Sequence, residues 1–191
     1  MCAQTSDIVD ASMFACLPVP KDGSCFYHAA IMSSEKTNIQ LGVLDKVSIL
    51  RATTAAWMRA NPDDVVDFVE DRARTLRDVA VSEYRGVDIS EAWGRVLDGV
   101  TKTDFAEAAS IHACARVLNV DVVVYSFDQG TRDLLKMRQS FRQCGCQPSL
   151  GTVHMLLDWE EKHFNVLLPL ALVSNLLCPC SCIGVQMCSF S

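Results

Sequence analysis

The spacing of apolar residues divides this chain into a helical first part and a strand-rich second part. Between residues 41 and 79, apolar side chains recur three or four positions apart, as on a helix with one buried face. After residue 119 this spacing gives way to short apolar runs that are rich in valine and leucine. These patterns predict an α+β fold, with a small, mostly antiparallel sheet between helical layers.

Five helices are predicted, and two of them carry most of the amphipathic pattern. The first of these two covers residues 41–60. The second is predicted to start at the Asn-Pro-Asp-Asp run of residues 61–64 and to continue through residue 79, because these residue types favour a helix cap and first turn. The other helices are predicted at residues 25–32, at residues 90–97, and from residue 101 or 103 to residue 118.

The second part of the chain predicts a sheet. Residues 120–125 are expected to form a central strand, because nearly all of them are apolar and such strands are covered on both faces. Residues 152–159 and 163–168 are expected to be two strands that are joined by a polar turn and close the sheet. The other non-helical segments are an extended lead-in at 14–20, an edge strand at 133–141 and a loop at 143–151.

Composition narrows the class of protein. At 191 residues, half of them hydrophobic, the chain is long enough for one domain with a substantial core. The net charge of −6 and the pI near 5.1 argue against a nucleic-acid-binding surface, which needs clustered lysine and arginine. The sequence has no secretory signal pattern, and its ten cysteines are irregularly spaced. We therefore expect reduced thiols and a cytoplasmic location.

A cysteine follows directly on a tight-turn sequence, Asp22-Gly23-Ser24, and opens an apolar helical pattern. Gly23 permits the turn, Ser24 is a helix-capping residue type, and Cys25 is then expected at the first residue of the helix. The positive end of the helix dipole and the free N–H groups favour the nucleophilic thiolate and are suited to hold an oxyanion. On this segment alone, a buried structural cysteine is an equally good interpretation.

A second polar pair lies at the start of the last predicted strand. Residues two apart on a strand face the same side, so His163 and Asn165 are expected to share a face. Asn165 can accept a hydrogen bond from one ring nitrogen of His163 and direct the other toward a thiol, as in a cysteine–histidine–asparagine triad. Taken singly, the two are more simply a turn histidine and a strand-edge polar residue. Together with the Cys25 turn, the triad is favoured.

Four features in the same order make the chain resemble the ovarian tumour (OTU) domain cysteine proteases, a family of deubiquitinating enzymes also found in viral proteins. The family opens with Asp-Gly-x-Cys before apolar and aromatic residues, as at residues 22–27, and ends with His, an aromatic residue and Asn or Asp, as at residues 163–165. Between them it carries a Trp-Gly pair, an acidic residue, an alanine-rich helix and an apolar strand. The corresponding positions are Trp93-Gly94, Asp104, residues 107–118 and residues 120–125.

The resemblance implies a papain-like architecture and a deubiquitinase mechanism. Cys25 would attack the carbonyl of the isopeptide or peptide bond after the C-terminal glycine of ubiquitin, with His163 moving the proton and Asn165 orienting His163. Water would then resolve the thioester, and no metal or cofactor is implied. The residues implied to support the oxyanion are those of the preceding turn, Asp22, Gly23 and Ser24.

The implied partners are conjugates of ubiquitin or of a ubiquitin-like modifier, and we expect a monomer that binds no nucleic acid. Two other functions remain open on the sequence: a viral-type protease of the same fold that processes its own polyprotein, and a catalytically silent ubiquitin-binding module. Intact Cys25, His163 and Asn165 argue against the silent module, because such a protein has no chemical reason to keep all three.

Two further candidates are assigned minor roles. His28 lies one turn after Cys25 on the same helix face and is poorly placed to take the thiol proton. The cysteines at 144 and 146, and those at 178–182, lack the CxxC spacing and the partner histidines of common zinc sites.

The resemblance covers residues 14–170, which we take as the OTU-like domain, and residues 1–13 are expected to be a flexible N-terminal lead. Residues 171–191 form an apolar, cysteine-rich tail of unknown role that is too short and too interrupted by proline to cross a bilayer. An added packed element or a polyprotein junction is favoured for this tail. Acylation of its four cysteines, which would bring the tail to a membrane, is the less favoured alternative.

Overall fold

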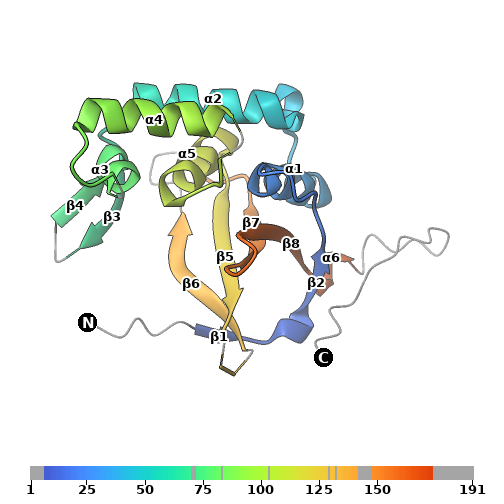
Figure 1. The fold of residues 1–191 in the computed structure, drawn as a ribbon. Coiled ribbons are helices and arrows are strands. Elements are labelled where there is room, and N and C mark those ends of the chain that lie inside the picture. The colour runs from blue at the N-terminus through green and yellow to red at the C-terminus, as the bar shows by residue number, and fades with distance from the viewer. Residues whose placement is uncertain are drawn as a thin grey trace.

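The computed structural model describes residues 7–69, 72–82, 84–102, 104–128, 130–131, 133–141 and 148–173. Its main element is a curled six-stranded sheet with the order β1-β6-β5-β7-β8-β2, and strands β3 and β4 form a separate hairpin (Figure 1). The strands are β1 Asp7–Val9, β2 Phe14–Leu17, β3 Val65–Val69, β4 Arg72–Thr75, β5 Asp121–Phe127, β6 Leu134–Phe141, β7 Thr152–Asp158 and β8 His163–Pro169. The α-helices are α1 Cys25–Lys36, α2 Val47–Ala60, α3 Leu76–Val81, α4 Ile89–Thr101, α5 Ala108–Leu118 and α6 Leu170–Val173, and two 3-10 turns cover Ala11–Met13 and Gly42–Asp45.

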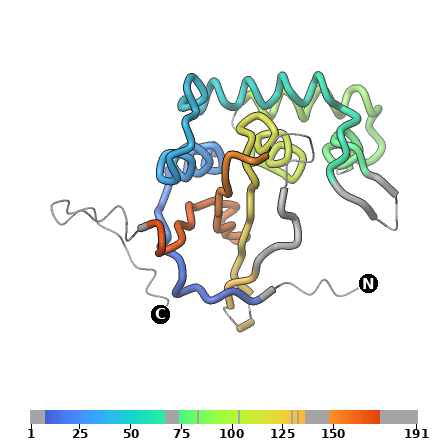
Figure 2. Tube along the Cα trace, turned by 180° about the vertical axis from the view of Figure 1, so that it is seen from behind, coloured from blue at the N-terminus to red at the C-terminus, as the bar shows by residue number. Residues whose placement is uncertain are grey.

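The longer helices lie in two layers over the sheet. Helices α1 and α5 contact strands, whereas α2 and α4 lie beyond them and contact each other, as Figures 1 and 2 show from opposite sides. The main core lies between the first layer and the sheet and includes Phe26, Cys114, Val122 and Met155. This arrangement confirms the predicted α+β class with a mostly antiparallel sheet.

Strand β5 is central, as its apolar run predicts. It pairs in parallel with β7 and antiparallel with β6. Val122 and Val124 enter the core below the helices, while Val123 and Tyr125 pack into a smaller cluster on the opposite face. Burial on both faces explains why the β5 sequence is apolar without alternation.

The predicted edge position of β6 is wrong. Strand β1 pairs with β6 on the side away from β5, with Ile8 opposite Leu135. Residues 7–9, within the predicted N-terminal lead, therefore belong to the sheet. Pairing between segments so far apart in sequence leaves no local signal, so composition alone placed β6 at an edge.

The helix predicted over residues 61–79 is also wrong, because most of that segment forms the β3–β4 hairpin. Strand β3 has the sequence Val-Val-Asp-Phe-Val, whose β-branched and aromatic residues favour a strand over a helix. The helix starts only at Leu76, where Thr75 and Asp78 form a reciprocal capping box. The backbone N–H of Leu76 donates to the Asp64 carbonyl at 2.7 Å, which joins the two ends of the hairpin.

The other helices were predicted with shifted ends. Helix α1 continues to Lys36, four residues beyond its predicted end. Helix α4 is capped by Asp88, whose Oδ1 accepts from the Ser90 and Glu91 N–H groups at 2.8 and 3.2 Å, so Ser90 lies inside the helix. Helix α5 begins at Ala108, beyond both predicted starts.

Most of the predicted loop at 143–151 and most of the cysteine-rich tail lie outside the described residues. Of that tail, the structure describes only the end of the short helix α6, which follows β8 directly. None of the helices within the described ranges combines the length and apolar content that a membrane crossing requires.

Candidate active site

The turn of residues 22–25, called the Cys loop below, is held together by its first residue. Gly23 has a φ of +76°, a conformation that glycine adopts without strain. The Asp22 Oδ1 accepts a 2.9 Å hydrogen bond from the Ser24 N–H. Helix α1 then begins at Cys25, whose own N–H belongs to the first turn and has no acceptor within the helix.

The Cys25 thiol lies in the interface between α1 and β8. Its residue is 3% exposed, and its Sγ accepts a 3.4 Å hydrogen bond from the Phe164 N–H. That nitrogen is bonded to the carbonyl carbon of His163, so the thiol lies beside the peptide bond between His163 and Phe164. The Phe164 ring packs against Phe26 and Phe105, with centroids 5.4 and 5.3 Å apart. Aromatic packing thus holds α1 against the strand that carries the histidine.

His163 and Asn165 lie on one face of β8, as strand alternation predicts. His163 Nε2 is 3.2 Å from Asn165 Oδ1, which also accepts a 3.4 Å hydrogen bond from the Val19 N–H. The backbone donor fixes the amide with its oxygen toward the histidine. Because Oδ1 is an acceptor, Nε2 carries the ring proton and Nδ1 is left with the lone pair that can take a proton.

A second histidine pair lies at the mouth of the Cys loop and is more exposed. His28 Nε2 is 2.9 Å from Asp22 Oδ2, with side-chain exposures of 29% and 50%. Desolvation is the largest single influence and raises the pKa of Asp22, but the hydrogen bonds from His28 and from the Ser24 N–H together outweigh it and hold the pKa below its ordinary value. His28 therefore pairs with the carboxylate of the turn, in keeping with its expected minor role.

Arg51 is a site residue that the sequence reasoning missed. It lies on α2 and is 2% exposed, and its guanidinium donates to the Ser24 Oγ at 3.2 Å. Ser24 is the residue before α1, as predicted, but its side chain makes no capping bond and binds Arg51 instead. The available signal was an arginine on the apolar face of an amphipathic helix, four residues after Val47 and four before Ala55.

The other cysteines that the structure describes are less suited to act as nucleophiles. Cys114 is fully buried in α5, and burial raises the pKa of its thiol to about 12. A thiol with that pKa stays protonated and unreactive at neutral pH. Cys16 lies on β2 and is partly exposed, without a helix N-terminus to stabilise a thiolate.

The sequence matches the family model of the OTU-like cysteine proteases over residues 20–164. The chain belongs to the OTU-like cysteine protease family. The matched segment contains Cys25 and His163, and Asn165 follows directly after its end. No curated protein matches the sequence.

Solved structures support the OTU fold at low sequence identity. The OTU of Hazara virus bound to ubiquitin is 16% identical, with a TM-score of 0.54 over 85% of this chain and 86% of that one. An OTU deubiquitinase from Wolbachia pipientis wMel is also 16% identical, with a TM-score of 0.54 over 84% of this chain and 91% of that one. The OTUD1 OTU domain is 14% identical, with a TM-score of 0.51 over 80% and 84% of the two chains.

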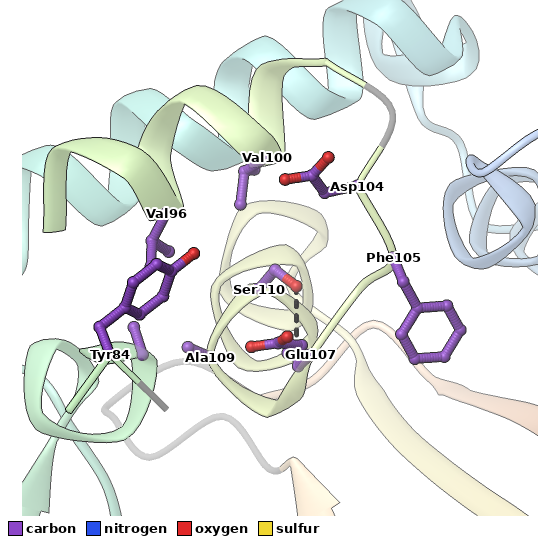
Figure 3. Close-up of a pocket in the computed structure, with 9 residues that line it drawn as sticks. Tyr84, Val96, Val100, Asp104, Phe105, Glu107, Ala109 and Ser110 are labelled. Carbon is purple, nitrogen blue, oxygen red and sulfur yellow. Dashed lines mark hydrogen bonds between the residues drawn. The ribbon is translucent and has the colours of Figure 1, made fainter. Parts of the chain in front are cut away.

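The motifs between the two ends of the OTU pattern have structural positions of their own. Trp93 lies on α4 and packs against the cluster shared by α2, α3, α4 and α5. Asp104 and Phe105 follow α4 and border a small cavity between α3, α4 and α5 (Figure 3). Figure 3 shows the Phe105 ring pointing away from that cavity, in keeping with its stacking on Phe164.

The remaining histidines have structural partners. His112 Nε2 is 2.7 Å from Asp64 Oδ2 and is buried between α5 and the start of the hairpin, while His154 Nδ1 is 2.9 Å from the Tyr125 hydroxyl. Within the described residues, no group of three histidine, cysteine or acidic side chains could hold a metal ion. The cysteines at 144, 146 and 178–182 lie outside those residues.

Proposed function

We propose that this protein is a cysteine deubiquitinase, with Cys25 as nucleophile, His163 as general base and Asn165 as the residue that orients it. One observation carries the proposal: the Cys25 Sγ is hydrogen-bonded to the peptide next to His163, whose Nε2 is bonded to Asn165. The three side chains come from a helix start and a strand that are almost 140 residues apart, with the helix and strand in direct contact. Hydrolysis of an amide by a cysteine thiol needs a nucleophile and a base that are brought together in this way.

The chemistry follows from the ring nitrogen that is left for the thiol. His163 Nδ1 takes the proton of the Cys25 thiol, and the thiolate attacks the carbonyl carbon of the C-terminal glycine of ubiquitin. The tetrahedral intermediate then collapses as its C–N bond breaks, and His163 returns the proton to the departing amine. Water, deprotonated by the same ring, hydrolyses the thioester and restores the thiol.

The oxyanion of the intermediate is assigned to the N–H of Cys25. The Ser24 N–H is already bonded to Asp22 at 2.9 Å, whereas the Cys25 N–H has no acceptor within α1. The positive end of the helix dipole adds to its effect, and one such donor is commonly worth about 3–4 kcal/mol in the transition state. Asp22 and Gly23 contribute by setting the shape of the turn.

Asn165 adds no charge of its own to this triad. An aspartate at the third position would add a negative charge to stabilise the imidazolium, and an amide does not. The contribution of Asn165 is therefore orientation, which the Val19 N–H reinforces by fixing the amide oxygen.

Ubiquitin is proposed as the substrate on two grounds. The fold is that of the Hazara virus OTU, which was crystallised bound to ubiquitin, and that of a Wolbachia OTU deubiquitinase. Cys25 and His163 are only 3% and 4% exposed, which favours a thin, extended C-terminus such as a diglycine tail over a bulky peptide.

The test uses ubiquitin with an electrophile at its C-terminus, incubated with the parent protein and with Cys25→Ala and followed by intact mass. A single adduct on the parent that is absent from the variant is expected. A small thiol reagent, iodoacetamide, serves as the control for a reactive Cys25. Selective labelling by iodoacetamide without any ubiquitin adduct would reject ubiquitin as the substrate. A Cys25 that reacts with neither reagent would reject the proposal that it is a catalytic nucleophile.

A further inference from the structure

Arg51 carries a buried positive charge whose hydrogen-bond acceptors are all neutral. Its residue is 2% exposed, and its guanidinium donates to four backbone carbonyls and one hydroxyl. Burying a charge costs free energy unless hydrogen bonds compensate, and five donors in one plane are the means that arginine has for this. So many bonds to backbone suggest that the side chain serves to connect segments.

One half of the guanidinium binds the end of α4. Nε donates to the Val100 carbonyl at 2.9 Å, and Nη2 donates to the Gly99 and Asp104 carbonyls at 3.1 and 3.2 Å. The last carbonyls of a helix lack N–H donors within it and carry the negative end of its dipole, which favours a cation there. Figure 3 shows Val100 at this helix end with Asp104 beside it.

The Asp104 side chain lies against a glycine of α4. A Cβ on Gly99 would clash with the Asp104 carboxylate, so a side chain at this position would displace that carboxylate. Gly99 therefore leaves room for the Asp104 side chain next to the two carbonyls that Arg51 binds.

The other half of the guanidinium binds the Cys loop. Nη1 donates to the Ser24 Oγ at 3.2 Å and to the Gly23 carbonyl at 3.4 Å, and the guanidinium carbon lies 4.7 Å from the centre of the Tyr27 ring. The peptide between Gly23 and Ser24 is therefore held at both ends, by Arg51 at its carbonyl and by Asp22 at its N–H. Hydrogen bonds at both ends restrain the rotation of this peptide, and the next N–H in the chain is that of Cys25.

We propose that Arg51 is a positioning residue, which fixes the Cys loop to the end of α4 and so aims the Cys25 N–H at the developing oxyanion. This inference rests on the proposed thiol chemistry of Cys25. Oxyanion donors act only when they are held at the correct distance and angle before the reaction. Arg51 touches no reacting atom, and its effect passes through Ser24 and Gly23.

The inference predicts different effects on two reactions of the same thiol. Acyl transfer passes through an oxyanion, whereas alkylation by iodoacetamide displaces iodide without forming one. Arg51→Lys keeps the charge but loses the planar set of donors. In this variant we expect kcat on a ubiquitin C-terminal amide to fall about 100-fold, with KM little changed, while alkylation of Cys25 stays within about threefold of the parent.

Met58→Ala is the matched control for lost stability. Met58 is fully buried on α2, two turns after Arg51, and packs into the cluster with Leu76 rather than against the Cys loop. Its truncation should lower Tm but leave the ratio of acyl transfer to alkylation at the parent value. Equal ratios in Arg51→Lys and Met58→Ala would show a merely structural arginine and overturn the inference.

A second variant tests the same inference. If Arg51→Lys does not fold, Ser24→Ala removes one of the bonds to the loop and should lower acyl transfer about threefold to tenfold without slowing alkylation. An unchanged ratio in that variant would equally overturn the inference.

A second assay measures the acylation of Cys25 by p-nitrophenyl acetate, detected by intact mass, and requires no ubiquitin. If the parent protein is acylated but forms no adduct with ubiquitin, ubiquitin is rejected as the substrate. The role of Arg51 can then still be tested through the acylation rate.

Discussion

The two sides of the candidate site reach their geometry by different means. On β8, His163 and Asn165 belong to one regular strand, and alternation alone puts both side chains on one face. On the nucleophile side the chain leaves regular structure, with Gly23 at a φ of +76°, and the turn is held by Asp22 from within and by Arg51 from outside. A strand thus supplies the base and its partner locally, whereas the nucleophile depends on contacts from α2 and α4.

The two histidine pairs near the thiol show the same contrast. His163 and Asn165 are bonded at 3.2 Å with the histidine buried, so water cannot compete for its ring. His28 and Asp22 are bonded at 2.9 Å, but the Asp22 side chain is half exposed. Burial, rather than hydrogen-bond length, distinguishes the pair that we assign to catalysis from the pair that supports the turn.

Removing the nucleophile should have the largest effect. Cys25→Ala deletes the atom that forms the thioester, so turnover of a ubiquitin C-terminal amide is expected to fall about 10⁶-fold, to background. Ubiquitin binding, measured by calorimetry, should persist because the fold is unchanged. Equal turnover in the parent and in Cys25→Ala would sink the mechanism.

Removing the base should be the next most damaging change. Without a proton acceptor beside the thiol, His163→Ala is expected to lose about 10³-fold in kcat/KM and to slow alkylation of Cys25 at neutral pH. His28→Gln is the matched control, since it alters a histidine on the nucleophile side, and it should lose less than about tenfold. A larger loss in His28→Gln than in His163→Ala would show that His163 is not the base.

The third position separates orientation from charge. Asn165→Ala should lower kcat about 10–100-fold, because His163 keeps its ring but loses the acceptor that orients it. Asn165→Asp restores an oxygen that can accept from both His163 and the Val19 N–H, so it should recover most of that loss. If steady-state kinetics found Asn165→Asp as slow as Asn165→Ala, the amide itself, rather than its oxygen, would be needed.

On the nucleophile side, Asp22 should make a small, pH-dependent contribution to stability. Its pKa is lower in the folded than in the unfolded chain, so the contribution is present above the unfolded value, near 3.9, and is lost as pH falls through the folded value. Half exposure screens the interaction, so we expect under about 0.5 kcal/mol. Asp22→Asn should therefore lower Tm slightly at pH 6 and not at pH 2.5. A difference in Tm that grew as the pH fell would contradict this assignment.

The smallest effect is expected where the two sides meet at the surface. Lys21 and Glu161 form an ion pair between the residue before the Cys loop and the β7–β8 turn, with side chains 63% and 54% exposed. Exposed pairs contribute little to stability, so Glu161→Gln should leave turnover and Tm nearly unchanged at any salt concentration. A marked loss of turnover at high salt in the parent alone would show that the pair helps to bring the two sides together.

The sequence predicted best where local rules apply. Strands β7 and β8 lie almost where the apolar runs place them, and α1 begins at Cys25 as the turn sequence predicts. The hydrogen bond between His163 and Asn165 follows from residues two apart on one strand. Each of these features depends on a few neighbouring residues, which is why the sequence alone predicts them.

Prediction failed where local signals competed or where the partner was distant. The run at residues 61–64 resembles a helix start, yet the valines that follow it favour the β3–β4 hairpin, which closes through the Leu76 N–H bond to Asp64. Strand β6 was predicted at an edge because nothing near it in the sequence reveals its pairing with β1.

The sequence by itself determined the family, the helix start at Cys25 and the shared face of His163 and Asn165, because motif order, turn chemistry and strand periodicity are local. Only the tertiary structure decided that the Phe164 N–H meets the thiol and that Arg51 joins the Cys loop to the end of α4. The physical reason is that a buried guanidinium takes its acceptors from whichever carbonyls packing brings within reach. Every residue type has the same backbone carbonyl, so no pattern of residue types could have revealed that contact.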